Sequence, residues 1–194
     1  MYIGTAKLVT PPTVEPVTLE EAKLHCRVDG TEEDAFITGL IVAARQTCEQ
    51  WCGRAFLAQT WDLYLRAFPA SCVYLPHPPV ASVTEITYLD AAGDQQTLDP
   101  AAYVLDDVSD PGRVVPAYGE TWPATRDFLN SVRIRYVAGV ASADEVDGRV
   151  KQAIRMIVAH WYQNRETVLS GTISKEIELA ARMLMGQLWS GVVG

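Results

Sequence analysis

Residues 159–171, AHWYQNRETVLSG, gather the side chains of this sequence that are best suited to chemistry. His160 could act as a general base if Glu166 held its imidazole ring in place. Residues six apart lie on different sides of a helix, so one helix would not bring these two side chains together, whereas His160 and Asn164 are true i, i+4 neighbours. A lone histidine among aromatic residues is more often part of the packing. We therefore expect no catalytic residue here, and an enzyme using His160 is kept as an alternative.

The same segment could form a protein–protein interface, and this interpretation does not require further residues from elsewhere in the chain. Trp161 falls on the apolar stripe of a helix and is expected to anchor the core, as Trp51 does on an earlier helix. Asn164, Arg165 and Glu166 mark the end of the helix. Tyr162, Arg165 and Glu166 are candidates for contact with a neighbouring subunit.

Motifs of nucleophilic and nucleotide chemistry do not occur in the sequence. It contains neither the G-x-S-x-G elbow nor the phosphate-binding patterns G-x-x-x-x-G-K-[ST] and G-x-G-x-x-G. Asp106, Asp107 and Asp110 could bind a divalent cation, but their loop lacks the D-x-[DN]-x-[DN]-G calcium pattern. We therefore expect no cofactor.

The cysteines give a weak signal for zinc. Cys48 and Cys52 would share one face of a helix, and completing a site would require Cys26, Cys72 or a histidine such as His25 or His77. None of these residues forms a C-x-x-C knuckle. We therefore expect reduced, buried thiols and no metal.

Composition bounds the class of protein. The 194 residues are 48% hydrophobic and 21% charged, which is typical of a globular chain. The net charge of -8 argues against a protein whose main affinity is for nucleic-acid phosphates. Without a long apolar run or a signal-like N-terminus, the sequence predicts a soluble intracellular product and no membrane partner.

Helical patterns bracket a β-rich middle. Thr18 with Glu21 forms a capping box for a short helix that reaches about Arg27. Thr31 is expected to cap a second helix, which Gly53 ends. Either Ser142 with Glu145 or Asp147 is expected to cap a third, long helix.

Between these helices the apolar residues alternate, which is typical of strands. We expect strands at 61–65, 73–75, 83–89, 95–98, 103–105, 113–115 and 132–137. Short turns such as Asp110-Pro111-Gly112 join them, so the strands should be antiparallel.

The sequence therefore predicts an α+β fold, in which a small helical core of two N-terminal helices and one long helix carries an antiparallel β-rich insertion and a C-terminal helical arm. The expected divisions are residues 1–56 for the N-terminal helical part and 57–140 for the insertion, with 141–171 for the long helix and 172–194 for the arm.

Several segments, in this order, resemble head-tail connector (adaptor) proteins of tailed bacteriophages and of phage-like gene transfer agents. The segments are V-T-L-E-E-A-K, R-V-D-G, P-A-Y-G-x-x-W-P and H-W-Y-x-N-R-E. Together they span nearly the whole chain, and the sequence does not separate phage from gene transfer agent.

The resemblance implies a virion component at the neck of a particle that assembles in the bacterial cytoplasm. Such adaptors form a ring, commonly of twelve copies, below the portal protein; they join a tail-side stopper or tail terminator protein and leave a channel for double-stranded DNA. Their C-terminal segment reaches the portal, which here implies contacts by Ile177, Leu184, Leu188 and Trp189. Relatives often carry a proline after the GTI segment, whereas this chain has none there, which favours a continuous terminal helix.

The acidic charge suits a channel through which DNA slides without tight binding, because carboxylates on the wall would repel phosphates. A general gain in solubility explains the same charge equally well. The main alternative is an assembly chaperone or binding module that is not retained in the particle.

Overall fold

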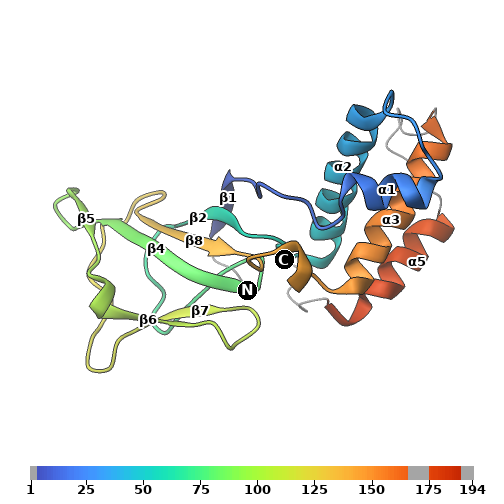
Figure 1. The fold of residues 1–194 in the computed structure, drawn as a ribbon. Helices are drawn as coiled ribbons and strands as arrows, with labels where there is room; N and C mark the ends of the chain where they lie inside the picture. Colours follow the sequence, from blue (N-terminus) through green and yellow to red (C-terminus); the bar gives the residue numbers. More distant parts are fainter. Residues whose placement is uncertain (1–3, 166–174, 189–194) are drawn as a thin grey trace. The chain divides into compact units, whose positions relative to one another are not determined.

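The structure, a computed structural model, describes residues 4–165 and 175–188. The chain divides into two compact units, which are treated separately below (Figure 1). Of the described residues, the sheet unit holds 4–12 and 53–140, and the helical unit holds 13–52, 141–165 and 175–188. Both units combine segments that lie far apart in the sequence.

Helix α1 (Leu19–Cys26) begins at the predicted capping box. The Thr18 hydroxyl accepts a hydrogen bond from the Glu21 backbone N–H at 3.1 Å, and the Glu21 carboxylate accepts one from the Thr18 N–H at 2.9 Å. Two backbone donors that a helix start leaves open are thereby satisfied. Arg27 ends the helix in the left-handed conformation, with φ of 59°.

Helix α2 (Asp34–Cys52) starts three residues later than its predicted cap at Thr31. The Thr31 carbonyl accepts a hydrogen bond from the Asp34 N–H at 3.2 Å, so a turn precedes the helix. Gly53 ends α2 with φ of 64°, as its position predicts.

Both predicted caps before the long helix are used, in succession. Ser142 and Glu145 close a capping box on a single 3-10 turn, and Asp147 then caps helix α3 (Gly148–Gln163). Helix α3 contacts α1, α2 and the last helix, α5 (Lys175–Met185), and it lies in the middle of this unit (Figure 1). Its apolar stripe is buried, including Ile154, Ile157, Val158 and Trp161.

The sheet unit holds two antiparallel sheets. The five-stranded sheet has the order β1-β2-β8-β4-β5, and the three-stranded sheet has the order β3-β7-β6. The strands are β1 (Thr5–Thr10), β2 (Gln59–Leu65), β3 (Val73–Tyr74), β4 (Val80–Leu89), β5 (Gln95–Thr97), β6 (Tyr103–Asp106), β7 (Arg113–Pro116) and β8 (Val132–Ala138). Seven of these strands lie where the sequence predicts them, and all their pairings are antiparallel.

Strand β1 corrects the expected division of the N-terminal part. The sequence places residues 1–56 in the helical part, but Thr5–Thr10 pairs with β2, with Thr5 opposite Tyr64 and Lys7 opposite Asp62. The strand is exposed along nearly its whole length, so it carries little of the alternation by which a strand is recognised. Its hydrogen bonds to β2 hold it in the sheet.

The core of the sheet unit lies between its two sheets. Leu63, Ile86, Ile134 and Tyr136 are fully buried there, and the Tyr136 hydroxyl donates to the Pro76 carbonyl at 3.0 Å. Among the helices that the structure describes, none combines the length and the apolar run that crossing a bilayer requires.

Candidate interaction surfaces

The end of helix α3 is tied to the start of α2. The Tyr162 hydroxyl donates a short hydrogen bond to the Glu33 carboxylate, and the Arg165 guanidinium donates to the other Glu33 oxygen at 2.5 Å. The guanidinium also lies 4.8 Å from the centre of the Tyr162 ring and 5.1 Å from that of Phe36. These four residues, which we call the α3-end cluster, combine an ion pair with two cation–π contacts.

The cluster holds Glu33 in its charged form. The hydrogen bond from Tyr162, followed by that from Arg165, lowers the pKa of the Glu33 carboxyl. The same hydrogen bond raises the pKa of the Tyr162 hydroxyl. Two of the predicted subunit-interface residues therefore already have partners in their own chain, whereas Glu166 lies outside the described residues. Contact with a neighbouring subunit stays a prediction.

His160 meets the neighbour that its spacing predicts. The Asn164 amide nitrogen lies 3.4 Å from His160 Nδ1 and donates to the His160 carbonyl at 2.9 Å. The Asn164 backbone N–H bonds the same carbonyl at 3.0 Å, which closes the helix at its C-cap. These contacts give His160 a place in the capping of α3.

Helix α5 has two different faces. Its inner face packs on α3, with Ala181 and Met185 buried, and the Met185 sulfur lies 3.7 Å from the Cys52 sulfur of α2. Its outer face exposes Leu179 and Met183, which are 61% and 74% exposed. The amphipathic segment expected as an arm thus forms a helix whose inner face packs on α3.

Two of the predicted portal contacts, Ile177 and Leu184, are half-buried on this helix, and their spacing places them on the face of Ala181. Leu188 lies in the single 3-10 turn that follows the helix, Gly186–Leu188, and is also half-buried. Trp189 lies outside the described residues. Attachment of these side chains to a portal protein stays a prediction, and part of their apolar surface is already used within the chain.

The two predicted core anchors differ in burial. Trp161 is 7% exposed and lies in the core of the helical unit. Trp51 is half-buried and carries the Arg182 guanidinium 4.9 Å from its ring centre, while Arg182 also pairs with Glu178 at 2.8 Å. Trp51 therefore holds α5 through its indole face.

The titratable residues proposed for metals serve other purposes. Burial, followed by the nearby charges of Cys52 and Glu49, raises the pKa of the Cys48 thiol to about 12, which keeps it protonated. Within residues 4–165 and 175–188, no three histidine, cysteine or acidic side chains gather as a metal site would require.

The Asp106 loop uses its carboxylates to hold its own shape. Asp106 accepts hydrogen bonds from the Ser109 hydroxyl at 2.7 Å and from Arg113 at 2.9 Å, and these lower the pKa of its carboxyl. Asp110 pairs with Arg54 at 2.6 Å. Two of the three carboxylates that could have bound a cation, those of Asp106 and Asp110, are thus each paired with an arginine of the sheet unit.

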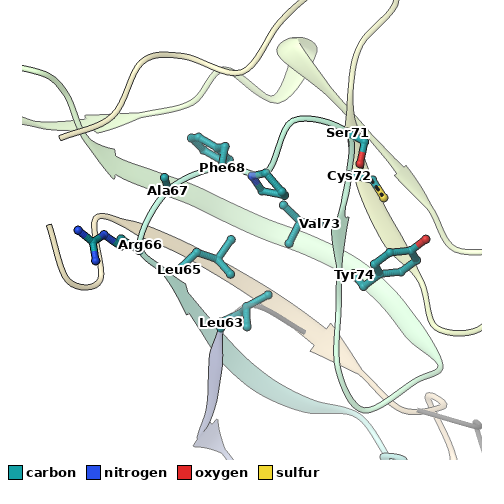
Figure 2. Close-up of a pocket in the computed structure, with 11 residues that line it drawn as sticks. Leu63, Leu65, Arg66, Ala67, Phe68, Ser71, Cys72, Val73 and Tyr74 are labelled. Carbon is teal, nitrogen blue, oxygen red and sulfur yellow. Dashed lines mark hydrogen bonds between the residues drawn. The ribbon is translucent and has the colours of Figure 1, made fainter. Parts of the chain in front are cut away.

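The sheet unit contains an apolar cavity of about 410 Å³ beside strand β2. Figure 2 shows Leu63, Leu65 and Val73 around it, together with the loop that carries Phe68 and Cys72. No carboxylate or imidazole is found among the described side chains that line it. The cavity can therefore hold apolar groups but does not offer an acid–base pair.

The P-A-Y-G-x-x-W-P loop divides into a packed and a free part. The Trp122 ring stacks on Phe68 with ring centres 4.6 Å apart and planes 3° from parallel. Tyr118, next to Gly119 with its φ of 86°, is fully exposed. One aromatic of the motif thus fixes the loop, and the other is available to a partner.

The comparisons with known proteins agree with this architecture. The family model of the head completion protein family matches residues 15–180. Among solved structures, a chain from the neck of an empty GTA (gene transfer agent) particle, computed with C6 symmetry, is 22% identical; the match covers 98% of this chain and 97% of that chain, with a TM-score of 0.80. A chain from the neck of a native GTA particle, computed with C12 symmetry, is 22% identical, with the same coverage and a TM-score of 0.76.

A chain from the virion of a native GTA particle is also similar, at 23% identity over 93% of this chain and 94% of that chain, with a TM-score of 0.73. No curated protein matches the sequence. At these identities the solved structures show that the fold is shared. The family model covers most of the chain and confirms the resemblance drawn from the ordered motifs: this chain belongs to the head completion protein family.

Proposed function

We propose that this head completion protein is a structural connector at the neck of a tailed phage or phage-like particle. The observation that carries the proposal is the match of the family model over residues 15–180. Fold similarity over nearly the full length to chains from GTA necks supports the location. The portal protein on the head side and a stopper or terminator protein on the tail side are the partners that such a position requires.

A closed ring of identical copies is the assembly that we propose. The C6 and C12 symmetries of the two similar neck structures support it. Cyclic symmetry needs two different surfaces on each copy, which meet head to tail around the ring. In this role the chain works through shape, apolar contact and charge, and it makes or breaks no covalent bond.

The pairing of charges in the sheet unit supports passage of DNA without tight binding. Arg135 makes two hydrogen bonds to Asp62, at 2.7 and 2.8 Å, and Arg66 pairs with Asp127 at 2.5 Å. Further arginines with a carboxylate partner are Arg54, Arg113 and Arg133. Because tight binding of phosphates needs unpaired basic groups, this arrangement and the net charge of -8 favour a surface that DNA slides past.

Particles from cells that carry an epitope-labelled copy test the location. Labelled antibody should mark the capsid vertex that bears the tail, and the protein should remain with particles through purification. A protein found only with immature heads would identify an assembly chaperone instead. A protein absent from particles of every stage would contradict the proposal.

The His160→Ala variant separates a structural role from an enzymatic one. A connector with this change should still give particles with tails, because the backbone carbonyl through which His160 closes α3 is retained in alanine. Normal incorporation combined with complete loss of infectivity or gene transfer would support the enzyme instead.

A further inference from the structure

The apolar cavity of the sheet unit lies where strand β1 begins. Gly4, the first residue that the structure describes, lines it together with Leu63 and Leu65 of β2. The cavity measures about 410 Å³, and Figure 2 shows Phe68 and Val73 on its other sides. Protein interiors contain few voids larger than a water molecule. A hollow of this size beside the core is therefore expected to hold an apolar side chain.

Gly4 lies in close contact with β2 at the wall of the cavity. A Cβ atom at this position would lie 2.4 Å from the Tyr64 carbonyl oxygen and 2.5 Å from Leu65 Cδ2. Both distances are too short for a real side chain, so the chain passes this closely because residue 4 is a glycine. The direction of the missing Cβ also shows that position 4 faces the leucines of the cavity.

The alternation of β1 identifies the next residue on this face. Ala6 lies opposite the buried Leu63 and packs against the core, whereas Thr5 and Lys7 are exposed. Successive side chains of a strand point to opposite faces, so positions 6, 4 and 2 share the face of the cavity. Position 2 is a tyrosine, Tyr2.

The register of β1 with β2 leads to the same place. Thr5 is opposite Tyr64 and Ala6 is opposite Leu63, so each step toward the start of β1 advances one residue along the chain after β2. Three further steps from Thr5 set Tyr2 opposite Ala67. Ala67 is itself one of the residues that line the cavity.

We propose that residues 1–3, which lie outside the described residues, dock on this cavity of their own chain and that the ring of Tyr2 fills it. A cavity of about 150 Å³ is enough to hold a benzene molecule in a protein core. The larger hollow here has room for a phenol ring between Leu63, Leu65 and Val73. This inference does not depend on the proposed function.

The chemistry of the cavity suits a tyrosine better than a wholly apolar residue. Its walls are apolar, but the exposed Ser71 and the half-exposed Tyr74 lie at its edge. Tyrosine combines an apolar ring with a polar hydroxyl that seeks a partner or water. The ring of Tyr2 can therefore be buried while its hydroxyl meets the Ser71 hydroxyl at the edge.

Covalent attachment favours this segment over a separate molecule as the occupant. Residues 1–3 directly precede Gly4, so they are held at the cavity at a high effective concentration. The segment Met-Tyr-Ile carries no charged side chain that burial would penalise. Docking would also secure the start of β1, an edge strand that is exposed along most of its length.

A cysteine pair in the purified full chain tests the position of Tyr2. Cys72 lines the cavity, so Tyr2→Cys should form an intrachain disulfide with it under mild oxidation in most molecules. The half-buried Cys26 would be replaced by serine, and the buried Cys48 and Cys52 would remain. The products are measured by mass spectrometry of peptides and by electrophoresis without reductant.

Ile3→Cys is the matched control, because alternation places position 3 on the opposite face from Tyr2. It should form the disulfide with Cys72 at a yield about tenfold lower. Equal yields from the two positions, or no disulfide from Tyr2→Cys, would overturn the inference. A disulfide that joins two chains would assign the cavity to the same segment of a second copy and would also overturn it.

The reactivity of the native Cys72 gives a second measurement. Tyr2→Ala should raise the rate at which a bulky maleimide alkylates Cys72 by about tenfold, since access controls the reaction of a thiol. Tyr2→Phe keeps the ring and should react as the wild type does. Cys26, in the helical unit, is the internal reference and should react at one rate in all three chains. An unchanged rate at Cys72 in Tyr2→Ala would show that this ring does not fill the cavity.

Discussion

The α3-end cluster and the outer face of α5 lie in the same helical unit, yet they satisfy their side chains in opposite ways. At the end of α3, Tyr162 and Arg165 both bond Glu33 of their own chain. On α5, Leu179 and Met183 leave most of their apolar surface exposed. The polar residues that resemble an interface are thus already paired within the chain, whereas the two apolar residues on α5 remain exposed.

This difference shows that residue type is a poor guide to which surface of a helix meets a partner. Arginine and tyrosine are common at protein interfaces, but they also form contacts within a chain whenever a carboxylate lies in reach. Two exposed apolar residues cannot be satisfied by a hydrogen bond or an ion pair within the chain, because only contact with another apolar surface removes them from water. The burial and the contacts of a side chain within its own unit show whether it is already used there or remains exposed.

The largest effect on stability is expected in the buried core of the helical unit, next to the α3-end cluster. Trp161→Ala should lower the free energy of unfolding by about 3–5 kcal/mol, because a large buried ring is lost and leaves a cavity. Urea denaturation followed by circular dichroism measures the change. Leu24→Ala, at a residue that is 81% exposed, is the control and should alter the free energy by less than about 0.5 kcal/mol. An unchanged midpoint for the tryptophan variant would show that this ring does not hold the core.

Two methionines on α5 offer a sharper test of its two faces. Met185→Ala should cost about 2–5 kcal/mol of unfolding free energy, since this side chain is 2% exposed and contacts Cys52. Met183→Ala, two residues earlier, should change the unfolding free energy by less than about 0.5 kcal/mol. The same denaturation experiment compares both variants directly. Equal effects would mean that α5 does not pack on α3 through one face.

The smallest effect concerns the charge state of Glu33. Removing its donors in Tyr162→Phe or Arg165→Gln should move the pKa of the Glu33 carboxyl upward from its lowered position. An NMR titration of the side-chain carboxyl carbon measures this shift directly. The same titration of the wild-type chain is the control, and an unchanged pKa of Glu33 in both variants would contradict the role of these donors.

The sign of the pH dependence follows from the same lowered pKa. A carboxyl whose pKa falls on folding stabilises the native state above its unfolded pKa, and this contribution disappears as the pH falls through the folded pKa. Wild type should therefore be more stable than Glu33→Gln at neutral pH, and the difference should vanish in acid. A difference that persists below the lowered pKa would assign the stabilisation to packing instead of charge.

Much of the fold follows from local patterns. The capping box at Thr18 and the stop at Gly53 depend on neighbours a few residues away, so they can be recognised in the sequence. The alternating strands from β2 to β8 likewise carry their signal in their own residues. Strand β1 differs, because only its hydrogen bonds to β2, more than 50 residues later, make it a strand.

The candidate surfaces show the same limit at the level of side chains. The i, i+4 contact of His160 with Asn164 is predictable because one helix fixes it. The contact of Glu33 with Tyr162 and Arg165 joins residues about 130 positions apart, and no local pattern announces it. Likewise, the sequence predicts that α5 is amphipathic, but it does not predict which segment packs against the apolar face of this helix.

The sequence by itself determined the helices, most of the strands and, through the order of its motifs, the family. These depend on backbone propensity, capping and apolar periodicity, all of which act over a few residues. Only the tertiary structure decided that the last helix packs on α3 through Met185 and leaves Met183 exposed. The physical reason is that a side chain is buried only when a segment from elsewhere in the chain packs against it. Two residues of one type on one helix can therefore lie in opposite environments in the folded protein.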